Sequence, residues 1–199
     1  MTGERNSATQ AETLAPSSLE SDSTRWRIFC AIELPRDVCN QANDHIQRLR
    51  ASLPNARASW ISEGKFHLTI KFLGDIPRGR VASLSLAAAQ ATRSISPFKL
   101  AIEGAGAFPR RGPAKVLWLG VRDSSRGLAL LHQCLEAVCA QAGFARDERS
   151  FQPHLTLARI REPQGARPLA SLHNEIGFAA VEFTVTELQV IRSVLRKSG

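Results

Sequence analysis

The chain has 199 residues, of which 43% are hydrophobic and 22% charged, and a formal net charge of +8 at pH 7. This length and composition suffice for one domain with its own hydrophobic core. No run approaches the roughly 18 consecutive apolar residues of a membrane-spanning helix, and residues 1–24 lack the apolar stretch of a signal peptide. We therefore expect a cytoplasmic protein that does not enter a membrane.

The first 24 residues differ in composition from the rest of the chain. They are rich in Ser, Thr and Glu and carry only two Leu, which predicts a disordered N-terminal tail followed by a single domain over residues 25–199. The tail holds four acidic residues and one Arg, a net charge of −3 within the total of +8, so the domain carries +11. Such a charge favours a polyanionic partner, either nucleic acid or another phosphate compound.

Hydrophobic periodicity predicts a mixture of strands and helices along the domain. Strands are indicated by two-residue alternation or short apolar runs, and helices by apolar residues spaced three to four apart. The predicted elements, in chain order, are a strand at Ile28–Leu34, a helix at Val38–Leu53, a strand at His67–Asp75, a helix at Val81–Ala91, strands at Phe98–Glu103 and Val116–Val121, a helix at Leu128–Val138, a strand at His154–Leu157, a helix at Pro168–Ile176, and strands at Val181–Val185 and Leu188–Ile191.

One short pattern occurs twice, as His67–Ile70 (His-Leu-Thr-Ile) and, 87 positions later, as His154–Leu157 (His-Leu-Thr-Leu). A strand-like run ends 33 residues before each His, and each interval contains a helical pattern. Self-similarity at a fixed period indicates an internal repeat. The sequence therefore predicts an α+β fold of two pseudo-symmetric lobes, related by duplication, with a cleft between them.

The repeated pattern has the layout of a catalytic site. Because side chains alternate along a strand, each His shares a face with its Thr, while the residue between them points into the core. Imidazole has an ordinary pKa of about 6.5, so one His can act as a general acid and the other as a general base. The Thr hydroxyls can donate hydrogen bonds to phosphate oxygens. We therefore predict His67, Thr69, His154 and Thr156 as the catalytic group, and the symmetry of the pattern leaves open which His is the acid.

Three further residues are candidates for substrate binding. Lys71 shares the predicted face of His67 and Thr69, and Arg159 follows the second motif, where a guanidinium could contact phosphate. Phe151 precedes the second motif and could stack on a nucleobase.

The other His and Cys residues have structural interpretations. His45, His132 and His173 lie in predicted helices without the ligand spacing of a metal site, so we expect surface or boundary positions. The Cys residues lie in predicted strands or helices without C-x-x-C spacing, which predicts buried, reduced thiols; they are Cys30, Cys39, Cys134 and Cys139. We expect neither a metal ion nor a cofactor.

Five segments, in order, resemble the bacterial RNA 2′,3′-cyclic phosphodiesterases, also called 2′-5′ RNA ligases, of the 2H phosphoesterase superfamily. The segments are Arg27–Pro35, Phe66–Gly74, Gly106–Pro109, Val116–Val121 and Phe151–Arg159. The resemblance implies a bilobed 2H phosphoesterase fold, with antiparallel-type sheets, outer helices and both motifs in a central cleft. It also implies metal-free hydrolysis of an RNA terminal 2′,3′-cyclic phosphate to a 2′-phosphomonoester, with His67 as proton donor and His154 as proton acceptor.

Other functions fit the same residues. Under the leading hypothesis the partner is RNA with a 2′,3′-cyclic phosphate end, the protein is a monomer without an obligate protein partner, and the reaction can run backwards as 2′-5′ ligation. A second hypothesis is a 2H esterase that acts on a small cyclic nucleotide, and a third is a noncatalytic module that binds RNA phosphates. A preference for longer RNA would separate the first from the second, because only the first needs basic surface beyond the cleft.

Overall fold

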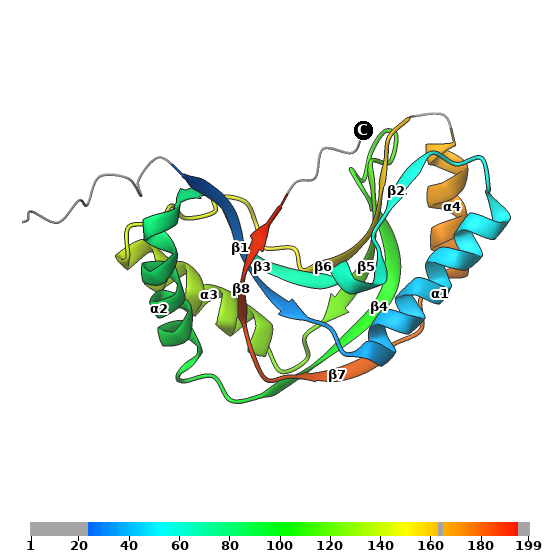
Figure 1. The fold of residues 1–199 in the computed structure, drawn as a ribbon. Coiled ribbons are helices and arrows are strands. Elements are labelled where there is room, and N and C mark those ends of the chain that lie inside the picture. Colours follow the sequence, from blue (N-terminus) through cyan, green and yellow to red (C-terminus); the bar gives the residue numbers. More distant parts are fainter. Residues whose placement is uncertain (1–23, 163–164, 195–199) are drawn as a thin grey trace, which may run out of the picture.

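Two antiparallel sheets form the framework of residues 24–162 and 165–194, which are the residues that the computed structural model describes. Apart from Thr24, the predicted N-terminal tail lies outside the described residues, as do residues 195–199. The first sheet has three strands in the order β3-β1-β8, and the second has five in the order β2-β6-β5-β4-β7. This arrangement, together with the flanking helices, confirms the predicted α+β fold (Figure 1).

The elements agree closely with the periodicity of the sequence. The strands are β1 (Arg25–Glu33), β2 (Ala58–Trp60), β3 (His67–Pro77), β4 (Phe98–Phe108), β5 (Val116–Arg122), β6 (His154–Ile160), β7 (Val181–Val185) and β8 (Gln189–Ser193). The α-helices are α1 (Arg36–Ser52), α2 (Val81–Thr92), α3 (Gly127–Gln141) and α4 (Ala166–Ile176), and the 3-10 helices are η1 (Glu63–Lys65) and η2 (Arg78–Arg80). The sequence did not predict β2, because three residues are too few to show a period.

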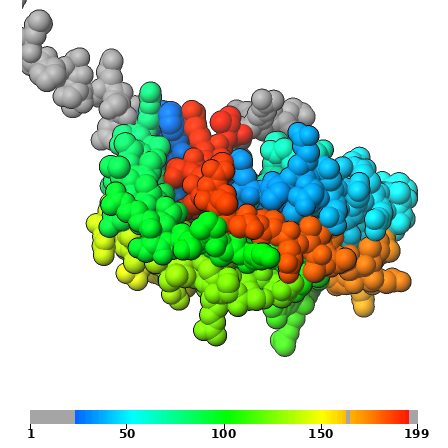
Figure 2. All heavy atoms as spheres, turned by 90° about the horizontal axis from the view of Figure 1, so that it is seen from below, coloured from blue at the N-terminus to red at the C-terminus, as the bar shows by residue number. Residues whose placement is uncertain are grey.

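The two sheets do not coincide with the two halves of the sequence. β4 belongs to the first half but pairs with β5 in the second sheet, whereas β8 comes from the end of the chain and pairs with β1. In Figure 1, α2 and α3 lie on one side of the sheets and α1 and α4 on the other. Figure 2 shows the C-terminal segment, coloured red, packed between N-terminal segments coloured blue. Each sheet therefore needs both halves of the chain, which fixes the position of one motif relative to the other.

A β-bulge follows the Thr of each motif. Opposite β1, the register passes from the pair Ala31 and Thr69 to the pair Cys30 and Lys71, so one extra residue lies in β3. In β6 the pairing with β5 skips one residue between Thr156 and Ala158 in the same way. A bulge shifts the alternation of all later side chains by one position. The residues directly beyond each bulge therefore face the opposite way from what simple alternation predicts; in β3 this holds only as far as a second register shift, between Phe72 and Gly74.

The apolar residues within the motifs anchor them to the hydrophobic core. Leu68 and Leu155, which separate each His from its Thr, are each 1% exposed, and Ile70 and Leu157 are buried as well. All four belong to one core cluster that includes residues from both sheets. Burying a Leu or Ile side chain contributes roughly 1.5–3 kcal/mol. The buried residues of each motif therefore keep its His and Thr on the opposite face of the strand.

Two of the histidines that we expected near the surface are buried instead. His45 in α1 is 3% exposed and His173 in α4 is 0% exposed, and their rings are joined by a 2.8 Å hydrogen bond. His173 Nε2 lies 3.0 Å from the carbonyl oxygen of Trp118. A carbonyl only accepts, so His173 Nε2 carries a proton, and His173 Nδ1 must accept from His45 Nε2. The prediction was wrong because α1 packs against α4 across the two sequence halves, which the sequence of either helix does not reveal.

This buried pair makes the protein sensitive to acid. Burial, together with the nearby charges of His173 and Arg48, lowers the pKa of His45 to about 4. An unfolded chain binds this proton near pH 6.5, but the folded chain does not until about pH 4. The free energy of unfolding should therefore decline by about 3 kcal/mol as the pH falls through this window. Urea titrations at about pH 7 and about pH 4.5 measure the difference, and it should shrink in His45→Leu; an unchanged difference would argue against this pair.

Candidate active site

The two motif histidines occupy equivalent positions with equivalent hydrogen bonds. His67 begins β3 and its Nδ1 lies 2.8 Å from the carbonyl oxygen of Lys65; His154 begins β6 and its Nδ1 lies 2.8 Å from the carbonyl oxygen of Gln152. Because a carbonyl can only accept, each Nδ1 carries the proton, and each Nε2 is left to react. A neutral ring then accepts a proton at Nε2, and a protonated ring donates one from it. Either histidine can thus serve as acid or base.

An aromatic ring borders each motif histidine. The ring of Phe29 lies 4.8 Å from that of His67, and the ring of Phe108 meets that of His154 edge-on at 5.2 Å. Phe108 also lies 5.1 Å from the indole of Trp118. We did not predict Phe29 or Phe108 as site residues. The local sequence gave no signal for either residue, because it does not show that Glu33 at the end of β1 pairs with His67.

The environment of His67 favours its neutral form. His67 is half-buried, and burial lowers its pKa below the ordinary value, although the hydrogen bond to the Lys65 carbonyl and the charge of Glu33 oppose this. Desolvation disfavours a charged imidazole. In the absence of a ligand, His67 is therefore mainly neutral near pH 7.

The two threonines lie beside their histidines, as predicted. Thr69 is exposed and lies opposite Ala31, and Thr156 is half-buried and lies opposite Trp118. Among the described residues, neither hydroxyl has a hydrogen-bond partner within the protein. Both hydroxyls can therefore donate to a ligand.

The strands that carry the two motifs approach each other although they belong to different sheets. Cα atoms of β3 and β6 come within 8 Å of each other, and the two strands lie side by side at the centre of Figure 1. The backbone N–H of Ile61, which precedes β3, donates to the carbonyl oxygen of Leu157 in β6 at 2.8 Å. The fold thus brings together two motifs that are 87 residues apart in the sequence.

Arg159 lies on the same face as His154 and Thr156, and it does so because of the bulge. Without the extra residue, Arg159 would face the core; with it, Ala158 is buried and Arg159 is exposed. Arg159 is paired with Val116 of β5 and Ser59 of β2. The position suits the predicted contact with phosphate.

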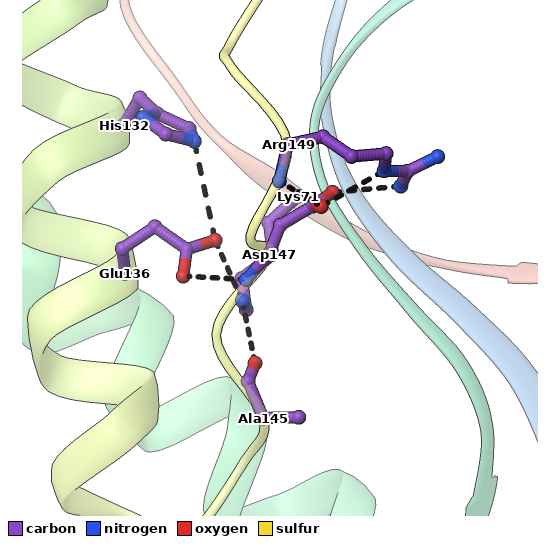
Figure 3. A network of polar contacts seen from close by, with 6 residues as sticks. All are labelled: Lys71, His132, Glu136, Ala145, Asp147 and Arg149. Carbon is purple, nitrogen blue, oxygen red and sulfur yellow. Dashed lines mark hydrogen bonds and ion pairs between the residues drawn. The ribbon is translucent and has the colours of Figure 1, made fainter.

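Lys71 does not lie where we predicted it. The bulge in β3 turns its side chain away from Thr69, and Lys71 is only 3% exposed. Its Nζ donates to Glu136 Oε1 at 2.6 Å and to the carbonyl oxygen of Ala145 at 2.9 Å, as Figure 3 shows. Lys71 therefore joins β3 to α3 and to the segment that leads into β6, and it is not exposed to a substrate.

Glu136 links this ion pair to the segment that precedes the second motif. Its other carboxylate oxygen accepts from the backbone N–H of Asp147 at 3.3 Å, and Asp147 in turn pairs with Arg149 at 2.7 Å (Figure 3). Three hydrogen bonds from Arg149, two from its guanidinium and one from its backbone N–H, hold the pKa of Asp147 well below its ordinary value, at about 2. The network ties β3 and α3 to residues 145–149, in the segment that leads into β6.

Phe151 lies next to the second motif but is already engaged on one face. Its ring stacks on that of His132 in α3 at 4.0 Å, with an angle of 7° between the planes. His132 is half-buried at the boundary of the core, as predicted. A nucleobase could reach only the other face of Phe151.

Cysteines and acidic residues do not converge on the site. Cys30, Cys39 and Cys139 are buried, as predicted, and Cys134 is half-buried. Within residues 24–162 and 165–194, no three His, Cys, Asp or Glu side chains lie together in a way that could hold a metal ion. In the same residues, no helix is both long enough and apolar enough to cross a membrane.

The fold and the paired motifs are those of the 2H phosphoesterases. The family model of the 2′-5′ RNA ligase superfamily matches residues 34–196, which is most of the chain. The protein therefore belongs to the 2′-5′ RNA ligase superfamily.

Individual relatives agree with this assignment. The chain is 31% identical over 176 residues to an RNA 2′,3′-cyclic phosphodiesterase of Methanothermobacter thermautotrophicus, covering 87% of this chain and 92% of the relative. It is 31% identical over 160 residues to the Escherichia coli RNA 2′,3′-cyclic phosphodiesterase, covering 80% and 85%. Among solved structures, E. coli LigT complexed with 3′-AMP is similar with a TM-score of 0.65 and 28% identity, covering 87% of this chain and 91% of LigT.

Proposed function

We propose that this protein hydrolyses the 2′,3′-cyclic phosphate at the end of an RNA to a 2′-phosphomonoester, by metal-independent catalysis between two histidines. The observation that carries the proposal is the matched pair of Nδ1 to carbonyl hydrogen bonds, which leaves both Nε2 atoms to react on strands that approach each other. The names of the relatives that are 31% identical support the same substrate.

In the proposed mechanism, His154 Nε2 takes a proton from water, and the water oxygen attacks phosphorus. The bond between phosphorus and the ribose 3′ oxygen breaks, and His67 Nε2 donates a proton to that oxygen. The products are a 2′-phosphomonoester and a 3′ hydroxyl, and the two histidines have exchanged protonation states. If the 5′ hydroxyl of a second RNA takes the place of water in the same ring-opening step, a bond forms between phosphorus and the 5′ oxygen while the bond to the 3′ oxygen breaks, so the same groups would perform 2′-5′ ligation.

The neighbouring side chains stabilise charge on the phosphate. Thr69 and Thr156 donate hydroxyl hydrogen bonds to the nonbridging oxygens, and Arg159 offers a guanidinium on the same face as Thr156. The anionic phosphate also raises the pKa of His67 when it binds, which offsets the effect of burial. His67 can thus be neutral in the free protein and protonated in the complex.

The reaction class, the position of the product phosphate and the need for metal can be tested together. RNA that ends in a 2′,3′-cyclic phosphate is incubated with the protein, with and without EDTA, and the product is identified by mass and by NMR of the terminal ribose. We expect a 2′-phosphate and equal rates in both conditions. Complete loss of activity in EDTA, with recovery on adding a divalent ion, would refute the mechanism.

The pH profile gives a second test of the two histidines. If one imidazole must be neutral and the other protonated, kcat/KM should follow a bell. Because burial lowers the pKa of His67, the midpoint of the limb that His67 controls should lie below about pH 6.5. NMR titration of His67 in the free protein should give a pKa that matches this limb. A flat profile between about pH 5 and 8.5 would remove the paired acid and base from the mechanism.

A further inference from the structure

A polar groove lies beside the motif face of the second sheet. It runs between the outer edge of β4, the turn that joins β4 to β5, and one face of α4, and its volume is about 880 Å³. Its walls include Arg110 from the turn, Arg167 and Asn174 from α4, and Trp118 from β5. β7 pairs with β4 only as far as Ile102, so the remaining edge of β4 is not covered by another strand in the part of the chain that is described.

The charge of this groove is positive and uncompensated. Arg110 and Arg167 are both exposed, and within residues 24–162 and 165–194 no carboxylate lies within 4.0 Å of either guanidinium. Some other exposed arginines do form ion pairs, as Arg57 does with Glu162 and Arg122 does with Glu103. Two unpaired guanidinium groups in one groove favour an anion with more than one charge, and their planar donors suit phosphate.

Trp118 connects the groove to the catalytic residues. In the sheet, Trp118 of β5 pairs with Thr156 of the neighbouring strand β6 and with Gly106 of the neighbouring strand β4. These three residues form one row across the sheet, from β6 to β4. The indole lies over Gly106, where a Cβ atom would come within 2.3 Å of the ring. The path from β6 to β4 covers two interstrand spacings, or about 10 Å. A short stretch of RNA that follows this row would reach the groove.

We propose that this groove is a second substrate subsite, which binds the RNA strand upstream of the terminal cyclic phosphate. Arg110 and Arg167 contact backbone phosphates there, and the polar atoms of Asn174 and Ser171 line the same wall. The inference rests on the proposed function and adds to it a binding site for the nucleotides that precede the reacting end, so that oligoribonucleotides bind better than single cyclic nucleotides. The two arginines contact phosphates, which are the same in every nucleotide, so the subsite confers a preference for length rather than for base sequence.

The experiment compares two substrates that share their reacting end. One is a nucleoside 2′,3′-cyclic phosphate, and the other is a short RNA that ends in the same nucleotide. For the unaltered protein we expect kcat/KM to be about 10-fold higher on the RNA, since two exposed contacts to phosphate together account for roughly that factor. Arg110→Gln/Arg167→Gln should remove this advantage and leave kcat/KM on the single nucleotide within about twofold. For this double variant acting on the RNA, the plot of log(kcat/KM) against log[salt] should also be less steep. The slope should change by about 0.7 for each phosphate that an arginine no longer neutralises.

A matched variant separates the groove from net charge. Arg93→Gln/Lys99→Gln removes the same charge from exposed positions after α2 and at the start of β4, and it should keep the full preference for RNA. Equal kcat/KM on both substrates in the unaltered protein would overturn the inference while the proposed function stands, as would an equal reduction in both double variants. Absence of turnover on both substrates would overturn the proposed function, and this inference with it.

Discussion

Replacing either His67 or His154 with Ala lowers kcat by about 10²- to 10⁴-fold, which is the usual contribution of a positioned general acid or base. The fold should survive, because both imidazoles lie half-buried on the motif face, while Leu68 and Leu155 hold the strands to the core. The measurement is kcat and kcat/KM on RNA with a cyclic phosphate end, beside a thermal melt of each variant. Near-normal turnover in either variant would rule out catalysis by the pair.

A modified substrate assigns the two roles. In a 2′,3′-cyclic phosphate whose 3′ oxygen is replaced by sulfur, the leaving group is a thiolate, which departs without needing a proton. If His67 is the acid, His67→Ala should recover most of its lost activity on this substrate, whereas His154→Ala should not. Recovery in His154→Ala alone would exchange the two roles and leave the site itself unchanged.

Replacing Lys71 with Met should cost about 3–5 kcal/mol of unfolding free energy, because it leaves the carboxylate of Glu136 without its cation in a largely buried position. The side chains of Lys71 and Glu136 are only 1% and 12% exposed, and their charged atoms lie 2.6 Å apart. Removing both charges, as in Lys71→Met/Glu136→Leu, should restore much of the stability. Urea unfolding of each variant gives the values.

A surface variant provides the control for this prediction. Lys99→Met makes the same substitution on an exposed strand residue, and it should change the unfolding free energy by less than about 0.5 kcal/mol. If Lys71→Met were as mild as Lys99→Met, the ion pair with Glu136 would not be structural. In that case Lys71 would again be a candidate for contact with substrate.

The wrong prediction for the side chain of Lys71 and the exposed position of Arg159 have the same cause. Strict alternation places Lys71 on the face of His67 and places Arg159 on the face opposite to His154. In the fold, one extra residue after each Thr reverses both assignments. A bulge depends on how two strands pair, and here the partner strands are β1 and β5, about 40 residues earlier in the chain. The local sequence therefore carries no alternation signal for it.

The buried histidines show a similar limit. His45 and His173 have polar side chains in amphipathic helices, for which exposure is the common outcome. They are buried because α1 and α4, from different halves of the chain, pack together and supply each ring with a partner. Neither helix alone specifies that contact.

The α-helices, the strands other than β2, the two His-x-Thr faces and the family could all be predicted from the sequence, because they depend on side-chain periodicity and on residues within a few positions of one another. The folded structure was needed to show that β4 and β8 pair with strands from the other half of the chain, that Lys71 is buried against Glu136, and that Arg159 lies on the face of His154 and Thr156. These features depend on pairing between segments that are far apart in the chain. Register and packing are set by the combined burial of both partners, so they appear only when the strands are in contact.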